Sequence, residues 1–123
     1  MKEGNLTRRI MLAASRAGAT TWRNNAGVAR YPDGSVVKYG VANPGGSDLI
    51  GLASIEVTPS MVGQRVAVFL AIEVKTPSGR LTDDQRRFLE FVRAAGGIGL
   101  VARSEDDLAP VVSLRIRKSQ DDA

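Results

Sequence analysis

A carboxylate and an amine stand two residues apart at the end of a long apolar run. Within the predicted strand 65–75, residues 66–74 are apolar almost without a break, which is typical of a strand covered on both faces. The run ends in Glu73-Val74-Lys75, and because alternate side chains of a strand share a face, Glu73 and Lys75 point the same way. A carboxylate can hold a divalent cation while an ammonium positions water or stabilises developing negative charge. The pair is therefore a candidate for hydrolysis. Its alternative role is only to mark where the strand leaves the core.

A second carboxylate opens the preceding predicted strand, residues 48–57. Asp48 follows residues 44–47 (Pro-Gly-Gly-Ser), a loop whose glycines permit close backbone approach to a ligand. If this strand pairs antiparallel with the one that ends at Glu73, the start of one lies beside the end of the other and the two carboxylates meet. With the Val74 carbonyl they would form an oxygen cage suited to Mg²⁺. The alternative is that Asp48 only ends the loop as an Asx cap.

The composition excludes several kinds of catalyst. The 123 residues contain neither Cys nor His. A disulfide, a thiolate nucleophile, a histidine-based triad and a histidine-ligated metal are therefore ruled out. Any enzyme written in this sequence must work with carboxylates, amines, hydroxyls and hard cations, and Mg²⁺ and Mn²⁺ prefer such oxygen ligands.

Basic side chains concentrate near the N-terminus. Lys and Arg number 17 against 13 Asp and Glu, and residues 1–40 carry seven basic side chains against two acidic ones. This imbalance indicates attraction to phosphate polymers, although many proteins without a nucleic-acid partner share it. No apolar run approaches the roughly 20 residues that span a bilayer, and the first residues lack the apolar segment of a secretory signal. We therefore expect a cytoplasmic protein with no membrane partner.

Hydrophobic periodicity predicts the order of the elements. Helices are predicted over residues 3–17, 82–95 and 105–108, and strands over 19–23, 48–57, 65–75 and 98–102. Residues 24–47 are predicted to form a long loop, and residues 109–123 a tail that frays. Helices that alternate with strands around a buried central strand predict an α/β sandwich. The length fits a single domain, residues 1–123, with its core at about 3–108.

Several segments carry a resemblance to a known family. They are Trp22-Arg23-Asn24-Asn25-x-Gly27, Gly45-Gly46-Ser47-Asp48-Leu49-Ile50-Gly51, Ile72-Glu73-Val74-Lys75-Thr76, Leu81-Thr82-x-x-Gln85 and the Gly96-Gly97 turn into Ile98-Gly99-Leu100-Val101. Together with a basic first helix, they resemble the VRR-NUC branch of the PD-(D/E)xK nucleases over roughly residues 3–108. The resemblance implies a restriction-endonuclease-like α-β-β-β-α-β sandwich with a central mixed sheet flanked by helices. Ser47 stands where the family has a proline before its metal-binding Asp.

The resemblance also implies roles for individual residues. Asp48, Glu73 and the Val74 carbonyl would bind Mg²⁺ or Mn²⁺, Lys75 would orient or activate the attacking water, and Gln85 would sit at the edge of the site. Gln85 is explained equally well by a capping box with Thr82. Glu3 is the best match to a further metal-adjacent Glu of the family. The candidate nucleic-acid contacts are Arg23, Asn24, Asn25, Lys38 and Arg80, although Asn-rich turns need no such role.

The expected function is hydrolysis of DNA phosphodiester bonds by a metal-dependent, structure-selective endonuclease that acts on branched or junction DNA. The family's nucleases of phage and repair systems suggest a homodimer in a bacterial or phage-infected host cell. Two alternatives stay open. One is a nucleic-acid-binding module whose catalysis has lapsed. The other is an RNA-directed nuclease or a partner-recruited subunit in packaging or replication.

Overall fold

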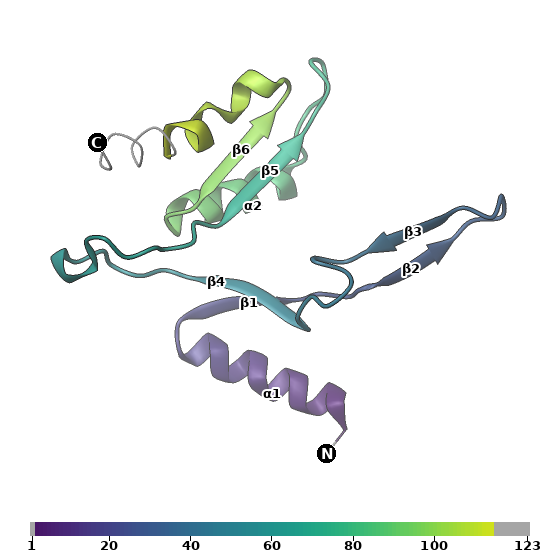
Figure 1. Ribbon diagram of the computed structural model, residues 1–123, viewed down its shortest axis with the longest axis horizontal. Coiled ribbons are helices and arrows are strands. Elements are labelled where there is room, and N and C mark those ends of the chain that lie inside the picture. Colours follow the sequence, from purple (N-terminus) through teal and green to yellow (C-terminus); the bar gives the residue numbers. More distant parts are fainter. Residues whose placement is uncertain (1, 115–123) are drawn as a thin grey trace. The chain divides into compact units, whose positions relative to one another are not determined.

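The computed structural model describes residues 2–114 of the chain (Figure 1). The chain divides into two compact units, here called the first unit (Met1–Ile55) and the second unit (Glu56–Ala123). Both combine helices with short strands, which confirms the predicted α/β class. The elements in chain order are α1 (Glu3–Arg16), β1 (Ala19–Arg23), β2 (Gly27–Arg30), β3 (Val36–Tyr39), β4 (Leu49–Ala53), η1 (Pro59–Met61), β5 (Leu70–Val74), α2 (Asp83–Ala94), β6 (Ile98–Ala102) and η2 (Glu105–Leu108).

In the first unit, α1 packs against an antiparallel ladder of β1 and β4. The register runs from Ala19 opposite Ala53 to Arg23 opposite Leu49. Gly51 lies in the middle of β4, where a Cβ would clash with the carbonyl oxygen of Thr20. A larger residue would therefore push the two strands apart. Within this unit β4 pairs with β1, and the pairing of the strand of Asp48 with the strand of Glu73, on which their predicted convergence depends, stays a prediction.

A hairpin of β2 and β3 occupies the segment for which the sequence predicted a loop. Figure 1 shows it extending away from α1 and the β1–β4 ladder. All four residues of β3 are exposed, so buried and exposed residues do not alternate along this strand. At the turn, the Asp33 carboxylate accepts hydrogen bonds from the hydroxyl and backbone N–H of Ser35, and these bonds hold the pKa of Asp33 below its usual value. In β2, partly buried and exposed residues alternate, but four positions are too few for periodicity to have revealed the hairpin.

The second unit is a parallel β5–β6 pair joined by α2, the crossover that parallel strands require. Leu89 and Val92 of α2 pack on Ala71 of β5 and form the core of this unit. The helix lies close to β6, because a Cβ at Gly99 would come 2.6 Å from the carbonyl oxygen of Leu89. Figure 1 shows α2 across one face of the two strands.

The strand β5 is shorter than its apolar run and is covered on one face. Ala71 is buried against α2, whereas Leu70, Ile72 and Val74 on the other face are exposed. The apolar run therefore predicted a strand in the right place, but the predicted cover on both faces is not formed within this unit. Residues 109–114, which the sequence assigned to a fraying tail, are helical. The rest of the predicted tail, residues 115–123, lies outside the described residues.

Replacing Val92 with Ala should lower the free energy of unfolding by about 2 kcal/mol. Val92 is 0% exposed, so the smaller side chain leaves a cavity in the core. The matched control is Val62→Ala, at a position that is 85% exposed, for which we expect a change within about 0.5 kcal/mol. Urea unfolding measures both. Equal effects of the two substitutions would show that the core of this unit lies elsewhere.

Candidate functional site

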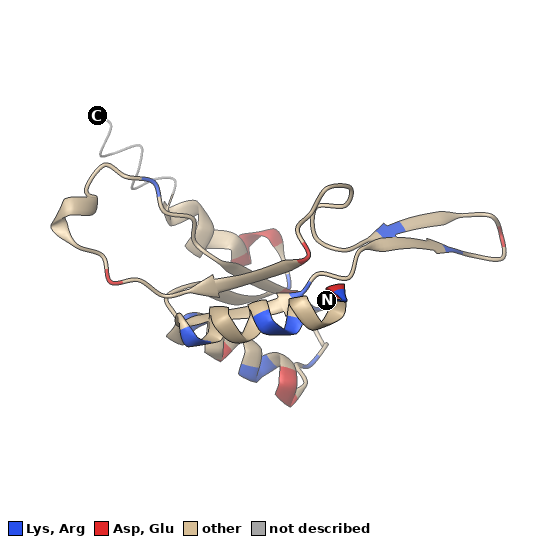
Figure 2. Ribbon diagram, turned by 90° about the horizontal axis from the view of Figure 1, so that it is seen from below, with Lys and Arg blue, Asp and Glu red and all other residues tan. Residues whose placement is uncertain are grey.

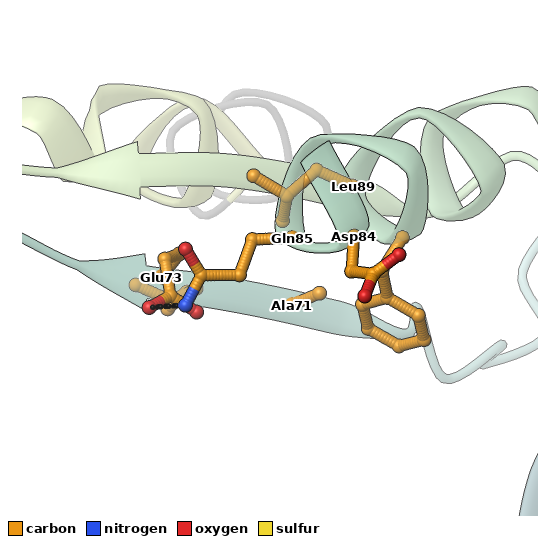
Figure 3. Close-up of a pocket in the computed structure, with 7 residues that line it drawn as sticks. Ala71, Glu73, Asp84, Gln85 and Leu89 are labelled. Atoms are coloured by element: carbon orange, nitrogen blue, oxygen red, sulfur yellow. Dashed lines mark hydrogen bonds between the residues drawn. The ribbon is translucent and has the colours of Figure 1, made fainter. Parts of the chain in front are cut away.

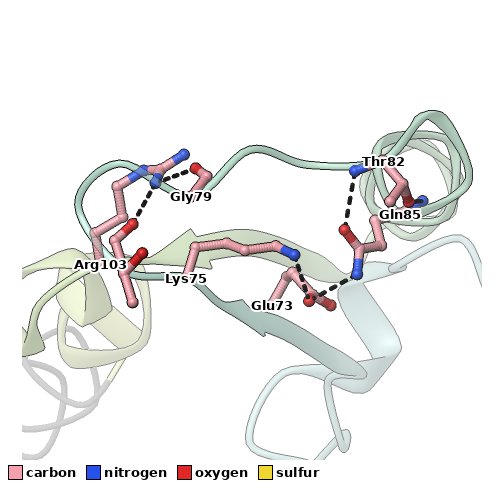
Figure 4. Close-up of polar contacts among 7 residues, drawn as sticks. Glu73, Lys75, Gly79, Thr82, Gln85 and Arg103 are labelled. Atoms are coloured by element: carbon pink, nitrogen blue, oxygen red, sulfur yellow. Dashed lines mark hydrogen bonds and ion pairs between the residues drawn. The ribbon is translucent and has the colours of Figure 1, made fainter.

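Glu73 and Lys75 lie side by side at the end of β5, as their spacing predicted (Figure 4). The Lys75 Nζ is 3.6 Å from the Glu73 Oε1, and both side chains are partly buried, with exposed fractions of 20% and 32%. They share the face of β5 that carries the buried Ala71, which is the face toward α2. The Lys75 backbone N–H donates to the Ala102 carbonyl at 3.1 Å, so strand pairing continues one residue beyond β5.

Gln85 joins the start of α2 to this pair. Its Nε2 donates to the Glu73 Oε1 at 2.9 Å, and its Oε1 accepts from the Thr82 backbone N–H at 3.0 Å. The Thr82 hydroxyl in turn accepts from the Gln85 backbone N–H at 3.1 Å. The capping box is therefore confirmed, and the same side chain also contacts the candidate catalytic carboxylate (Figure 4). The two explanations of Gln85 that the sequence left open are compatible, since each end of one amide serves one of them.

The second oxygen of Glu73 has no hydrogen-bond partner among residues 2–114. Both protein contacts, from Gln85 and from Lys75, are to Oε1. A carboxylate held by one oxygen keeps the other available for a cation or for water. Beside it is a hollow of about 310 Å³ between β5 and α2. Figure 3 shows that Glu73 and Gln85 lie at one end of this hollow and Asp84 at the other, and the lining residues are Ala71, Ile72, Glu73, Asp84, Gln85, Phe88 and Leu89.

Arg103 fixes the loop that leaves the site. Its Nη1 donates to the carbonyl of Thr76 at 2.7 Å and to that of Gly79 at 2.6 Å (Figure 4). Arg103 was not among the residues predicted from the sequence to have a role. It could have been found only from the parallel register: Val74 pairs with Ala102, so Arg103 follows β6 at the level where Lys75 follows β5.

In the first unit, Asp48 and Glu3 line a common hollow of about 260 Å³. Asp48 immediately precedes β4, and Glu3 is in the first turn of α1, where a negative charge interacts favourably with the helix dipole. Both residues were expected to lie near a metal. Three of the candidate nucleic-acid contacts, Arg23, Asn24 and Asn25, also line this hollow. The other lining residues are Gly4 and Thr7.

Asn24 holds the loop that leads into Asp48. Its backbone N–H donates to the Asp48 carbonyl at 2.9 Å. Its Nδ2 donates to the carbonyls of Val41 and Ser47 at 2.9 and 3.0 Å, and its Oδ1 accepts from the Val41 N–H at 2.7 Å. Both amide N–H bonds are thus used by the backbone. The structure gives Asn24 a positioning role, and its contact with nucleic acid stays a prediction.

The candidate metal ligands are divided between the two units. Asp48 and Glu3 are in the first unit, and Glu73 and the Val74 carbonyl are in the second. Among the described residues, no group of three or more acidic side chains is gathered tightly enough to hold a metal ion. The convergence of Asp48 with Glu73, which the sequence analysis expected, stays a prediction.

The other candidate contacts are cationic and exposed. Lys38 is on β3, opposite Val28, and Arg80 precedes α2. Neither forms an ion pair with any residue in the range 2–114. Figure 2 shows basic positions recurring along α1. The first unit has seven basic and three acidic side chains, and the second has ten of each, so the whole net charge of +4 belongs to the first unit.

The model of the VRR-NUC domain family matches residues 10–106, well over half of the chain and parts of both units. The matched range contains Asp48, Glu73, Lys75 and Gln85, and it begins after Glu3. Comparison with curated proteins and with solved structures gives no match. No helix within residues 2–114 is long and apolar enough to cross a membrane. The resemblance seen in the sequence is confirmed, and with it a function of the nuclease type: the chain belongs to the VRR-NUC domain family.

Proposed function

We propose that the protein is a metal-dependent endonuclease that hydrolyses the phosphodiester bonds of DNA and prefers branched or junction DNA. The observation that carries the proposal is the state of Glu73. Its Oε1 is held by Gln85 and faces Lys75, while its Oε2 has no partner among the described residues. Such a carboxylate is oriented by its contacts at one oxygen while the other oxygen stays available for a ligand.

The donor atoms fit a hard divalent cation. The residues that would hold it are Asp48, Glu73 and the Val74 carbonyl, with Glu3 as a further carboxylate, and all of them offer oxygen. Neither Asp48 nor Glu3 forms an ion pair with another described residue, so neither carboxylate is neutralised by a fixed cation. When bound, Mg²⁺ or Mn²⁺ supplies Lewis-acid stabilisation of phosphoryl oxygens and favours the deprotonated form of water.

The side chains of the second unit supply orientation and positive charge. Lys75 holds its ammonium within 3.6 Å of the Glu73 carboxylate. There it can position the attacking water or stabilise the negative charge that develops on the phosphate oxygens. Gln85 fixes the rotamer of Glu73 through one hydrogen bond, and the capping box fixes Gln85 in turn. These contacts reduce the reorganisation needed when substrate binds.

The proposed substrate is DNA because of the charge and the family. The net positive charge of the first unit favours a phosphate polymer. The exposed cations Arg23, Lys38 and Arg80 are the proposed backbone contacts, together with Asn25. We further propose a homodimer whose two sites cut opposing strands of a branched substrate. By analogy with stand-alone phage and bacterial members of the family, we expect it to act in the cytoplasm of a bacterial or phage-infected cell.

A panel of substrates tests this function. Linear, flapped and four-way DNA and single-stranded RNA are incubated with the full chain in Mg²⁺, Mn²⁺ or EDTA. We expect cleavage of the branched DNA with either metal and none in EDTA. Binding of DNA without cleavage under every condition would show a nucleic-acid-binding module whose catalysis has lapsed. Faster cleavage of RNA than of any DNA would show an RNA-directed nuclease.

Substitution of the core residues tests their roles. Glu73→Gln, Asp48→Asn and Lys75→Ala should each lower kcat at least about 10²-fold, since each removes a charge proposed to act on the reacting phosphate. Single-turnover cleavage of the preferred DNA measures this. Glu90→Gln, the same change at an exposed position of α2, is the matched control for Glu73→Gln and should keep wild-type kcat. A core variant that also keeps wild-type kcat would remove that residue from the mechanism.

The two functions of Gln85 can be separated. Gln85→Glu keeps an oxygen that accepts the Thr82 N–H but places a second carboxylate against Glu73, so we expect kcat to fall about tenfold or more. Thr82→Ala removes the hydroxyl half of the cap and should cost about 1 kcal/mol of stability while the Glu73 contact persists. Cleavage kinetics and urea unfolding are measured for both. If the loss of kcat in Gln85→Glu and Thr82→Ala were instead proportional to their loss of unfolding free energy, Gln85 would act only as a cap.

A further inference from the structure

We propose that Arg103 is a positioning residue for the site: it holds the loop between Lys75 and α2, residues 76–81, and thereby fixes Lys75 and Gln85 around Glu73. Arg103 does not itself touch Glu73 or Lys75 in any contact between described residues. Its effect on catalysis would therefore pass through the loop. The effect on rate rests on the proposed nuclease function, while the hold on the loop can be tested without it.

The contacts of Arg103 are unusual for an exposed side chain. One nitrogen, Nη1, donates to the Thr76 carbonyl at 2.7 Å and the Gly79 carbonyl at 2.6 Å, and it lies 3.4 Å from the carbonyl oxygen of Pro77. The two short bonds have a charged donor, which makes them stronger than bonds between neutral groups. These carbonyls are in irregular backbone, where no strand or helix partner is available to them.

The base of Arg103 is itself fixed. Arg103 follows Ala102, whose carbonyl accepts the Lys75 N–H at 3.1 Å, so the two residues start from adjacent rungs of one parallel ladder. The Arg103 backbone N–H donates to the Asp107 carboxylate at 2.7 Å, and the Ser104 N–H donates to the same oxygen at 3.2 Å. The guanidinium therefore reaches the loop from a rigid end of β6.

The loop has one internal hydrogen bond of its own among the contacts of the described backbone, from the Gly79 N–H to the Thr76 carbonyl at 3.0 Å. Its first end is Lys75, fixed by strand pairing, and its second end is Thr82, fixed by the capping box with Gln85. Both ends carry a contact to the Glu73 Oε1, at 3.6 Å from Lys75 and 2.9 Å from Gln85. Figure 4 shows this circuit, with Arg103 beside Gly79 in one part of the view and Gln85 beside Glu73 in another. Among residues 2–114, Arg103 is the side chain whose hydrogen bonds join the backbone of this loop to the end of β6.

Loosening the loop should lower the rate more than the stability. Arg103 is exposed, so its hydrogen bonds compete with water and contribute little to the folded state. A displacement of about 1 Å in a group that orients a reactant can cost up to about 10²-fold in rate. If Arg103 instead bound a DNA phosphate, its loss would raise KM and flatten the dependence of binding on salt.

The test compares Arg103→Ala and Arg103→Lys with two controls. Arg65→Ala removes the same charge from an exposed position of the second unit. Arg93→Ala removes a comparable bond, from the Arg93 Nε to the Gly99 carbonyl at 2.6 Å, which ties α2 to the other end of β6. The four variants are made in the full chain. The measurements are kcat and KM on the preferred DNA, the unfolding midpoint, and hydrogen–deuterium exchange of the amides of residues 75–82.

We expect Arg103→Ala to lower kcat by about tenfold to 10²-fold with KM within twofold of wild type, and to raise exchange in residues 75–82. Arg103→Lys should keep part of the rate because its ammonium can still donate to a carbonyl. Millimolar guanidinium chloride, far below denaturing concentrations, should restore part of the kcat of Arg103→Ala and have no such effect on Arg93→Ala. Arg65→Ala should match wild type in every measurement.

The proposal is overturned if Arg103→Ala keeps wild-type kcat, if KM carries the whole loss, or if Arg93→Ala reproduces the same kcat and exchange changes. A chain that cleaves no nucleic acid, but whose residues 75–82 exchange faster in Arg103→Ala than in Arg93→Ala, would overturn the nuclease and support the hold of Arg103 on the loop. The two failures are therefore distinguishable.

Discussion

The contact between Gln85 and Glu73 constrains most of the second unit. A partly buried carboxylate needs a hydrogen-bond partner, and here the partner is a side chain that is already committed to the start of a helix. The helix can begin only where Thr82 and Gln85 complete their capping box, so the start of α2 is tied to the end of β5. The close approach of α2 to β6 in turn requires a glycine at position 99. One amide thus couples the geometry of the fold to the geometry of the site.

In each unit, a side chain satisfies irregular backbone beside a candidate functional carboxylate. The loops that lead into Asp48 and out of Lys75 are irregular, and their backbone groups lack the partners that a helix or a sheet would supply. Asn24 satisfies the loop before Asp48 with both ends of its amide. Arg103 satisfies the loop after Lys75 with one end of its guanidinium. In both cases a side chain directly after a neighbouring strand supplies the hydrogen bonds that strand pairing would otherwise supply. The loop can therefore be irregular and still ordered.

Local patterns predicted local features well. The capping box of Thr82 and Gln85, the strands over 19–23 and 98–102, and the shared face of Glu73 and Lys75 each depend on residues within four positions of one another. Features that depend on partners outside such a short window were missed. The β2–β3 hairpin was missed because β3 is exposed throughout and the alternation of β2 spans only four residues. The partner of β4 is β1, a choice that apolar runs cannot specify. Arg103 contacts carbonyls 24 to 27 residues away. Every residue has a backbone carbonyl, so the sequence does not show which carbonyls an arginine will contact.

The distribution of charge separates two kinds of cation. In the second unit, Arg86 forms an ion pair with Asp83, and Arg87 with Asp84, in the first turns of α2. The two carboxylates interact favourably with the helix dipole, and the arginines neutralise their charge. Those cations are used within the unit, and its ten basic and ten acidic side chains cancel. In the first unit, Arg23, Arg30 and Lys38 are exposed and form no ion pair with a described residue. A field from unpaired cations extends into solvent over roughly a Debye length, whereas paired charges cancel at that range. Long-range attraction of a phosphate backbone should therefore come mainly from the first unit, which carries the net charge, while Arg80 and the proposed catalytic pair Glu73 and Lys75 in the second unit would act on a phosphate at short range.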